Sequence, residues 1–202
     1  TEKGKYRGGC HVCLPNFGPD LTGTLSQHGF GRSIEWERNF NDEPDAVALT
    51  MPLVGDDYPD YAGLRAELRY ATSDAGGPHT TLQLNVSNEG SDILRVAPAF
   101  HPYFAKGPED TVWLDGQKLG LAELSEAQFC SGPDHTLVIG GRELRLASEQ
   151  LQEWAIWTDA PDKYICVEPT LVGPSFSRAG APDPRELLAP GDIRTYEFQI
   201  YA

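Results

Sequence analysis

The sequence lacks several features that would assign it to familiar classes of protein. No apolar run approaches the roughly 18 residues of a membrane-spanning helix, and the polar residues 1–5 contain no signal-peptide core. Only 4 cysteines occur in 202 residues, which does not suggest a disulfide scaffold, and without an export signal we expect reduced thiols. These absences predict a soluble, cytoplasmic protein with no membrane partner.

Positive charge is also scarce. Lys and Arg total 16 against 30 Asp and Glu, which gives a formal net charge of −14. A nucleic-acid partner is therefore not expected, because binding a polyphosphate requires a cationic face that releases counterions. A small anionic ligand would need arginines gathered locally against this background.

Frequent Gly and Pro divide the chain into short segments, as is typical of an all-β protein; there are 21 Gly and 16 Pro and no internal repeat. Apolar residues take every second position in residues 80–87 and again in residues 195–201. We expect further strands at residues 47–51, 64–71, 93–99, 136–139, 143–147, 153–158 and 164–167, one helix at 119–129 and a turn at 183–188. The pattern predicts a single domain, residues 1–202, of two packed antiparallel sheets.

Three short motifs place titratable or cationic side chains where strand-like sequence meets Gly or Pro. They are Gln27-His28-Gly29-Phe30-Gly31-Arg32, His101-Pro102-Tyr103-Phe104 and Ile165-Cys166-Val167-Glu168-Pro169. A rigid sheet commonly delivers residues to a pocket at such boundaries. With Arg7-Gly8-Gly9 and Leu14-Pro15-Asn16-Phe17-Gly18 ahead of them, these motifs resemble the galactose mutarotase superfamily, and most of all its glucose-6-phosphate 1-epimerases.

The resemblance implies a large mutarotase-type β-sandwich that interconverts the anomers of a hexose 6-phosphate without a metal or other cofactor. His101 matches the general acid of the superfamily and Glu168 its general base. Anomer exchange needs these two roles, because one group takes the proton of the C1 hydroxyl and another protonates the ring oxygen. Without the resemblance, a core-edge histidine bonded to backbone is the favoured interpretation of His101, whereas a solvated carboxylate at a strand end is the weaker interpretation of Glu168.

The resemblance also assigns the binding of a sugar or sugar phosphate to Arg7, His28, Arg32 and Asp134. Guanidinium groups suit this task because they grip a phosphate dianion bidentately. The match at Asp134 is weak, since Gly132-Pro133-Asp134-His135 fits a turn-capping aspartate equally well. Two alternatives remain open: a free-aldose 1-epimerase, and a non-catalytic sugar-binding or regulatory sandwich.

Several features depart from the family pattern or stand beside it. Cys10-His11 replaces the apolar-Pro pair that usually follows Arg-Gly-Gly. Cys10 and Cys13 form a C-x-x-C, for which we prefer buried thiols over structural zinc. We expect that one aromatic ring stacks on the sugar; the candidates are Phe17, Phe30, Tyr103 and Phe104.

The position of the Arg-Gly-Gly motif is the remaining departure. Family members carry several strands ahead of it, whereas here only 6 residues precede Arg7. This predicts a sandwich shortened at its N-terminus, with a sheet edge left unpaired or covered by association. We expect a monomer or a weak homodimer.

Overall fold

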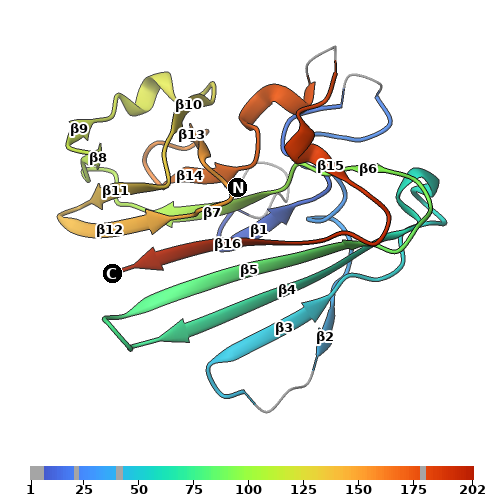
Figure 1. The fold of residues 1–202 in the computed structure, drawn as a ribbon. Coiled ribbons are helices and arrows are strands. Elements are labelled where there is room, and N and C mark those ends of the chain that lie inside the picture. Colours follow the sequence, from blue (N-terminus) through green and yellow to red (C-terminus); the bar gives the residue numbers. More distant parts are fainter. Residues whose placement is uncertain (1–6, 21–22, 40–42, 178–180) are drawn as a thin grey trace.

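The computed structural model describes residues 7–20, 23–39, 43–177 and 181–202, and strands dominate them. Two large antiparallel sheets lie one over the other (Figure 1), with five strands in one and nine in the other. A two-stranded ribbon and short 3-10 turns complete the described structure. The predicted all-β sandwich is confirmed.

The strands pair in an order that differs from their order in the chain. In spatial order, the five-stranded sheet contains β1 (Cys10–Cys13), β7 (Ala99–Ala105), β14 (Tyr164–Thr170), β13 (Glu153–Trp157) and β10 (Gln128–Ser131). The nine-stranded sheet contains β2 (Glu37–Asn39), β3 (Ala46–Thr50), β4 (Leu64–Ser73), β5 (His79–Asn88), β16 (Ile193–Tyr201), β12 (Arg142–Ala147), β11 (Asp134–Ile139), β8 (Val112–Leu114) and β9 (Gln117–Lys118). The ribbon pairs β15 (Leu187–Leu188) with β6 (Leu94–Arg95), and the 3-10 turns are η2 (Pro59–Tyr61), η3 (Leu121–Glu123), η4 (Gly173–Ser177) and η5 (Pro184–Glu186).

The β4–β5 hairpin shows how alternation in the sequence becomes a buried face. Its register runs from Leu64 opposite Asn88 to Ser73 opposite His79. Every second residue of β5 turns inward, and Leu82, Leu84 and Val86 are buried. Successive strand side chains point to opposite faces, so the period-2 pattern in residues 80–87 correctly predicted this half-buried strand.

Aromatic side chains join the two sheets across the core. Phe100 of β7 and Trp154 of β13 each lie 6.0 Å, between ring centroids, from Phe198 of β16. All three are fully buried, and burial of a side chain of this size stabilises the fold by roughly 1.5–3 kcal/mol. Since Phe100 faces the core, its neighbour His101 must face the other side of the five-stranded sheet.

Two local predictions were inaccurate. The helix expected at residues 119–129 is wrong: η3 gives it a single 3-10 turn, and its last residues belong to β10. There Phe129 pairs with Ala155 of β13, so sheet pairing overrides the helical spacing. The strand expected at residues 93–99 is reduced to β6 and the first residue of β7, while the turn expected at residues 183–188 contains η5.

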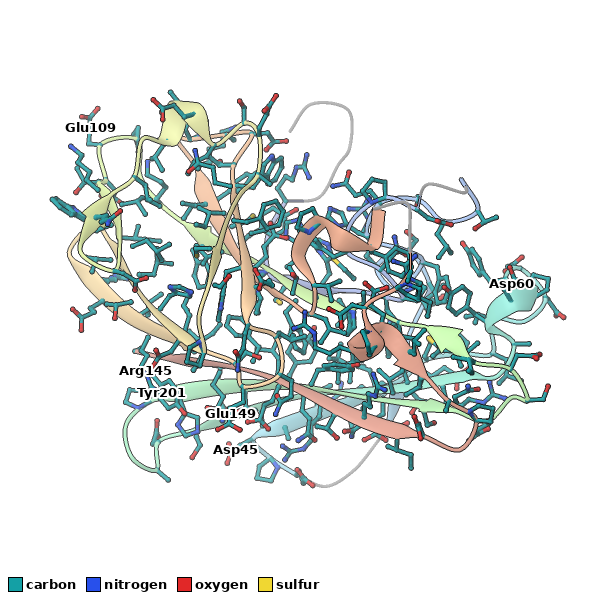
Figure 2. All side chains as sticks on the ribbon, turned by 45° about the horizontal axis from the view of Figure 1, so that its top comes forward. Asp45, Asp60, Glu109, Arg145, Glu149 and Tyr201 are labelled. Carbon is teal, nitrogen blue, oxygen red and sulfur yellow. The ribbon has the colours of Figure 1, made fainter. Side chains whose placement is uncertain are left out.

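The outer surface carries most of the charge. Figure 2 labels Asp45, Asp60, Glu109 and Glu149 at the periphery of the molecule, away from the interior of the sandwich.

Within the described residues, no helix has the length and apolar character needed to cross a membrane.

Candidate active site

A pocket of about 760 Å³ opens on the face of the five-stranded sheet that points away from the core. Its lining includes residues from all five motif segments singled out in the sequence; Arg7, His28, Arg32, His101 and Glu168 are among them. They come from segments that are distant in the sequence, and the fold brings these segments to one cavity. We take this cavity as the candidate active site.

Cross-strand register sets the floor of the pocket. His11 of β1 pairs with His101 of β7, and Glu168 of β14 pairs with Ala155 of β13. In the β7–β14 pairing, Cys166 lies opposite Tyr103 and Thr170 opposite Ala99, and this register places Glu168 level with His101. Directly opposite residues of neighbouring strands share a face, so His11, His101 and Glu168 point the same way.

The His101–Glu168 pair is buried but incompletely satisfied. Nε2 of His101 lies 3.5 Å from Oε2 of Glu168, with side-chain exposures of 4% and 2%. Nδ1 of His101 and Oε2 of Glu168 have no hydrogen-bond partner among the described residues. Buried polar groups are normally hydrogen-bonded, so free polar atoms in a pocket indicate groups that await a ligand.

Burial dominates the ionisation of this pair. Desolvation, together with smaller effects from neighbouring His11 and His28, lowers the pKa of His101 to about 2. Desolvation also raises the pKa of Glu168 well above the ordinary carboxyl value. Both shifts favour uncharged side chains, that is, a neutral imidazole beside a carboxylic acid.

His28 reaches the pocket from a loop held against β1. The His28 backbone N–H donates to Phe17 O at 3.0 Å, and Nδ2 of Asn16 donates to the carbonyls of Gly18 and Ser26. His28 itself has a φ of +70°, a left-handed conformation that non-glycine residues rarely adopt. Its pKa is lowered to about 4, mainly by burial, and its Nδ1 has no partner within the described structure.

Glycine is required next to His28. Gly29 has a φ of +59°, and a Cβ there would lie 2.2 Å from the carbonyl oxygen of Leu14. Gly31 N–H donates to the same oxygen at 2.8 Å. The His-Gly-Phe-Gly sequence therefore lets the loop approach the end of β1 closely, which directs His28 toward His101; their ring centroids are 5.2 Å apart.

His11 is a pocket residue that the sequence analysis did not identify as one. Its ring centroid lies 4.4 Å from that of His101, and its Nε2 has no hydrogen-bond partner among the residues described. Burial lowers the pKa of His11 to about 4, with smaller effects from Arg32 and Arg7. In the sequence, the departure from the family pattern at Cys10-His11 was the signal that could have identified His11 as a pocket residue.

The two expected phosphate ligands differ in their surroundings. Arg7 Nη2 forms an ion pair with Asp159 at 2.5 Å, its Nη1 lies 3.4 Å from Tyr103 Oη, and its guanidinium stands 5.4 Å from the Trp157 ring centroid. Arg32 is exposed at the pocket wall, with no hydrogen bond or ion pair to any described residue. Asp159 could not have been singled out from the sequence, because only the fold places it beside Arg7.

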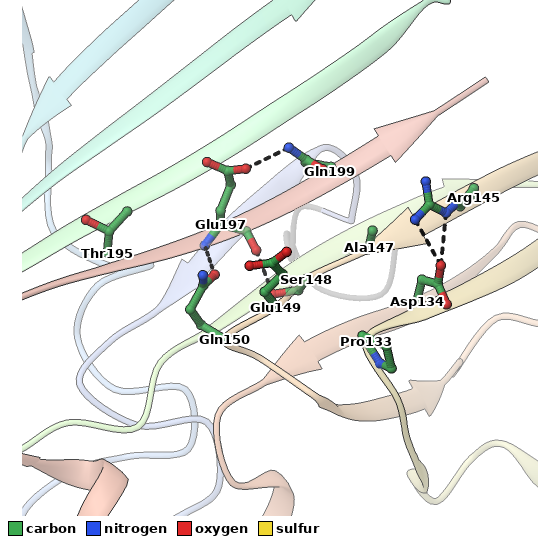
Figure 3. A pocket seen from close by; sticks show the side chains of 10 residues that line it. All are labelled: Pro133, Asp134, Arg145, Ala147, Ser148, Glu149, Gln150, Thr195, Glu197 and Gln199. Atoms are coloured by element: carbon green, nitrogen blue, oxygen red, sulfur yellow. Dashed lines mark hydrogen bonds and ion pairs between the residues drawn. The ribbon is translucent and has the colours of Figure 1, made fainter. Parts of the chain in front are cut away.

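Asp134 is not brought to this pocket, which corrects the expectation drawn from the motif pattern. It lies on β11 in the other sheet and forms an ion pair with Arg145 at 3.0 Å (Figure 3). Both residues line a separate hollow on the outer surface of the nine-stranded sheet. In Figure 2, Arg145 lies beside Tyr201, and its guanidinium is 5.3 Å from that ring. No feature of this hollow joins Asp134 to His101 or Glu168.

Aromatic side chains and cysteines complete the comparison with expectation. Phe17 and Tyr103 line the pocket, together with Trp157, whereas Phe30 is buried and packs on Tyr58. Cys10 is partly buried and Cys13 fully buried, both as free thiols. Among the described residues, the one group with metal-ligand spacing is His101, Cys166 and Glu168, which does not include the C-x-x-C.

Comparison with known proteins identifies the family of this chain. The family profile of aldose 1-epimerases matches residues 2–132. A curated Escherichia coli relative named "Putative glucose-6-phosphate 1-epimerase" is 29% identical over 116 residues, which cover 54% of this chain and only 36% of that protein.

Solved structures share the fold at low sequence identity. A galactose mutarotase-like protein from Lactobacillus casei superposes with a TM-score of 0.75 at 16% identity, covering 95% of this chain and 84% of the other. The Slr1438 protein of Synechocystis gives a TM-score of 0.74 at 18% identity, covering 98% and 79%. The sandwich is therefore the galactose mutarotase-like fold, and the family profile spans well over half of the sequence. This chain belongs to the aldose 1-epimerase family.

Proposed function

We propose that this protein is an isomerase that interconverts the α and β anomers of a hexose 6-phosphate. The observation that carries the proposal is the buried His101–Glu168 pair, 3.5 Å apart, in a pocket that Arg7 and Arg32 also line. The family assignment supports anomer exchange, and the name of the E. coli relative supports a phosphorylated sugar.

The reaction needs a base at the C1 hydroxyl and an acid at the ring oxygen. Without a bound sugar, burial favours the neutral form of the pair, in which the proton is on Glu168 and His101 is uncharged. A bound sugar favours the other form, because its C1 hydroxyl donates a hydrogen bond to the Glu168 carboxylate and its ring oxygen accepts one from the His101 imidazolium. Substrate binding thereby moves the proton from Glu168 to His101.

Ring opening then follows with protons and electrons balanced. Glu168 takes the proton of the C1 hydroxyl, the C1 carbonyl forms, and the bond between C1 and the ring oxygen breaks. The ring oxygen keeps that electron pair and receives a proton from His101. Rotation about the C1–C2 bond presents the other face of the aldehyde, and the same two groups run the steps in reverse.

Other polar groups of the pocket hold the substrate. His11 Nε2 and His28 Nδ1 are unpartnered buried atoms among the described residues and suit sugar hydroxyls. Arg32 offers its guanidinium to the phosphate, while Arg7 must share its charge between the phosphate and Asp159. Phe17 and Trp157 supply flat apolar surfaces for the sugar ring.

Substrate class is tested by comparing arginine variants on two sugars. A charge-assisted hydrogen bond is worth about 1.5–3 kcal/mol, so Arg7→Ala and Arg32→Ala should each raise KM for glucose 6-phosphate roughly ten- to hundredfold. The KM for glucose should change far less. Arg145→Ala is the matched control, because Arg145 is ion-paired outside the pocket, and it should change neither KM. Equal losses on both sugars for Arg7 and Arg32 variants would contradict the phosphosugar assignment.

One observation favours a second substrate class. Arg7 already has a carboxylate partner at 2.5 Å, which weakens its availability for phosphate and favours a free aldose. In that case glucose or galactose would be turned over as well as glucose 6-phosphate. The same kinetic comparison separates the two, since a free-aldose enzyme would show no selective loss of phosphosugar use in Arg32→Ala.

A further inference from the structure

Cys166 is the buried nucleophilic side chain closest to the catalytic pair that the proposed reaction does not use. It lies on β14 two residues before Glu168 and therefore on the same face of the strand. It is buried as a free thiol, with no hydrogen-bond partner among the described residues. Register places it between Tyr103 of β7 and Trp157 of β13, both of which line the pocket.

The thiol forms a compact set of three potential ligands with the catalytic pair. A ring nitrogen of His101, the Cys166 sulfur and a carboxylate oxygen of Glu168 all lie within 4.8 Å of one another. Two ligands of a tetrahedral Zn²⁺, at about 2.0–2.3 Å from the metal, stand roughly 3.3–3.7 Å apart. The 3.5 Å between His101 Nε2 and Glu168 Oε2 meets this spacing, and the sulfur needs to approach by about 1 Å.

From this geometry we propose that His101, Cys166 and Glu168 form a site for Zn²⁺ or a similar thiophilic divalent cation, and that occupation of this site inhibits the enzyme. One imidazole, one thiolate and one carboxylate are a donor set that selects Zn²⁺ or Co²⁺ over Mg²⁺ and Ca²⁺. The two anionic ligands neutralise the charge of the cation, which a buried site requires. The Glu168 side chain is 2% exposed, and its Oε2 has no hydrogen-bond partner within the described structure that would compete with such a ligand.

The pocket gives the cation an entrance and leaves one coordination position open. His101 and Glu168 both line the cavity, so the fourth position faces it and can take water. A cation held there occupies the lone pairs that the proposed reaction uses for proton transfer. In this respect the inference rests on the proposed function: binding stands by itself, whereas inhibition requires the proposed pair.

Binding is tested first, with Co²⁺ as a spectroscopic probe of the reduced, chelator-treated protein. Wild type should develop a thiolate-to-cobalt charge-transfer band in the near ultraviolet, and Zn²⁺ should displace it. Cys166→Ala should lose the band, and Glu168→Gln should weaken Co²⁺ binding at least tenfold, since it removes another ligand. Cys13→Ala is the matched control, because Cys13 is a fully buried thiol in the same sheet outside the ligand set, and it should keep the band.

The outcomes of the binding arm are decisive in either direction. A band that disappears only in Cys166→Ala supports the site. No band in wild type at millimolar Co²⁺, or an undiminished band in Cys166→Ala, overturns it. If Cys166→Ala fails to fold by circular dichroism, Glu168→Gln decides in its place, and unchanged Co²⁺ affinity in that variant overturns the site.

Inhibition is tested second, as the ratio of mutarotation rates with and without Zn²⁺ for each variant. Zn²⁺ should lower the rate of wild type and Cys13→Ala at least tenfold, and EDTA should restore it. The rate of Cys166→Ala should be nearly the same with and without Zn²⁺. An active enzyme that Zn²⁺ does not inhibit overturns the inference and leaves the proposed function standing. A wild-type protein that shows the cobalt band but accelerates no anomer exchange keeps the metal site and removes the proposed function.

Discussion

Two histidine–carboxylate pairs lie in different sheets of this protein, and they have opposite characters. Nδ1 of His135 lies 2.6 Å from Oδ2 of Asp115, and the other carboxylate oxygen accepts from Thr136 N–H at 2.8 Å. In the five-stranded sheet, His101 and Glu168 are 3.5 Å apart and each keeps an unpartnered buried atom among the described residues. The first pair is satisfied by its neighbours, and the second is not.

Solvent and hydrogen bonding explain the difference in ionisation. Partial burial alone would raise the pKa of Asp115, but hydrogen bonds from His135 and Thr136 outweigh it and the pKa is lowered. Glu168 has the opposite shift, because burial raises its pKa. Asp115 is 49% exposed while Glu168 is 2% exposed. A close, partly exposed pair whose hydrogen bonds are satisfied stabilises the fold. A buried pair with unpartnered atoms keeps its protons available for a ligand.

The largest expected effect comes from exchanging the Glu168 carboxylate for its amide. Glu168→Gln should lower kcat for mutarotation by about 10²–10⁴-fold, because the base that takes the C1 proton is lost. Polarimetry of glucose 6-phosphate measures the rate. Asp115→Asn is the matched control and should stay within about threefold of wild type. Near-wild-type turnover in Glu168→Gln would remove this residue from the mechanism.

The same substitution should change the pH dependence of stability. A raised pKa in the folded state means that the unfolded chain loses its proton first, so Glu168 lowers the stability of the wild type as the pH rises above 4.5, the ordinary carboxyl value. Glu168→Gln lacks this penalty. Its advantage in the free energy of unfolding should therefore grow, by up to about 1.4 kcal/mol per pH unit, above that pH.

Chemical denaturation at pH 4 and pH 7 measures this change. Asp115→Asn serves as the contrasting variant, because its wild-type carboxyl has a lowered pKa. An advantage of Glu168→Gln that is equal at the two pH values would show that the folded protein does not hold Glu168 in a raised-pKa state.

A smaller effect is expected at His11, the pocket residue next to the open pair. His11→Leu replaces the imidazole with an apolar side chain of similar size. It removes Nε2, which has no partner in the described structure and faces bound sugar in our proposal. A neutral hydrogen bond contributes about 0.5–1.5 kcal/mol, so KM should rise two- to tenfold with little change in kcat. A large fall in kcat with KM unchanged would instead make His11 part of proton transfer.

The smallest effect is expected at the satisfied pair. The lowered pKa of Asp115 stabilises the fold above pH 3.8, its ordinary value, and this contribution is lost as the pH falls through the folded pKa. Because Asp115 is half-exposed, solvent screening limits the cost of Asp115→Asn to about 0.5–1 kcal/mol at pH 7. Thermal unfolding should show a small difference at pH 7 that disappears near pH 2. A difference that persists at pH 2 would contradict an electrostatic origin.

The contrast between the two pairs also shows which site residues the sequence could single out. His101 and Glu168 stood out because each belongs to a recognisable motif at a strand boundary, and both line the pocket. Asp134 was placed by its order between these motifs. That order did not reveal that β11 belongs to the other sheet, where Arg145 of β12 is its partner. A motif of several residues constrains position more strongly than a single aspartate does.

The sequence by itself determined the β class and the faces of the strands, because side-chain direction alternates with a fixed period of two. It also supplied the glycine at position 29, where the fold brings the backbone so close to Leu14 O that any Cβ would collide. Only the tertiary structure decided which side chains meet across strands. His11 lies beside His101, and Asp159 beside Arg7, because strand register and loop closure join residues far apart in the chain. Local sequence carries no record of such cross-strand neighbours, since their contacts arise only when the sheet forms.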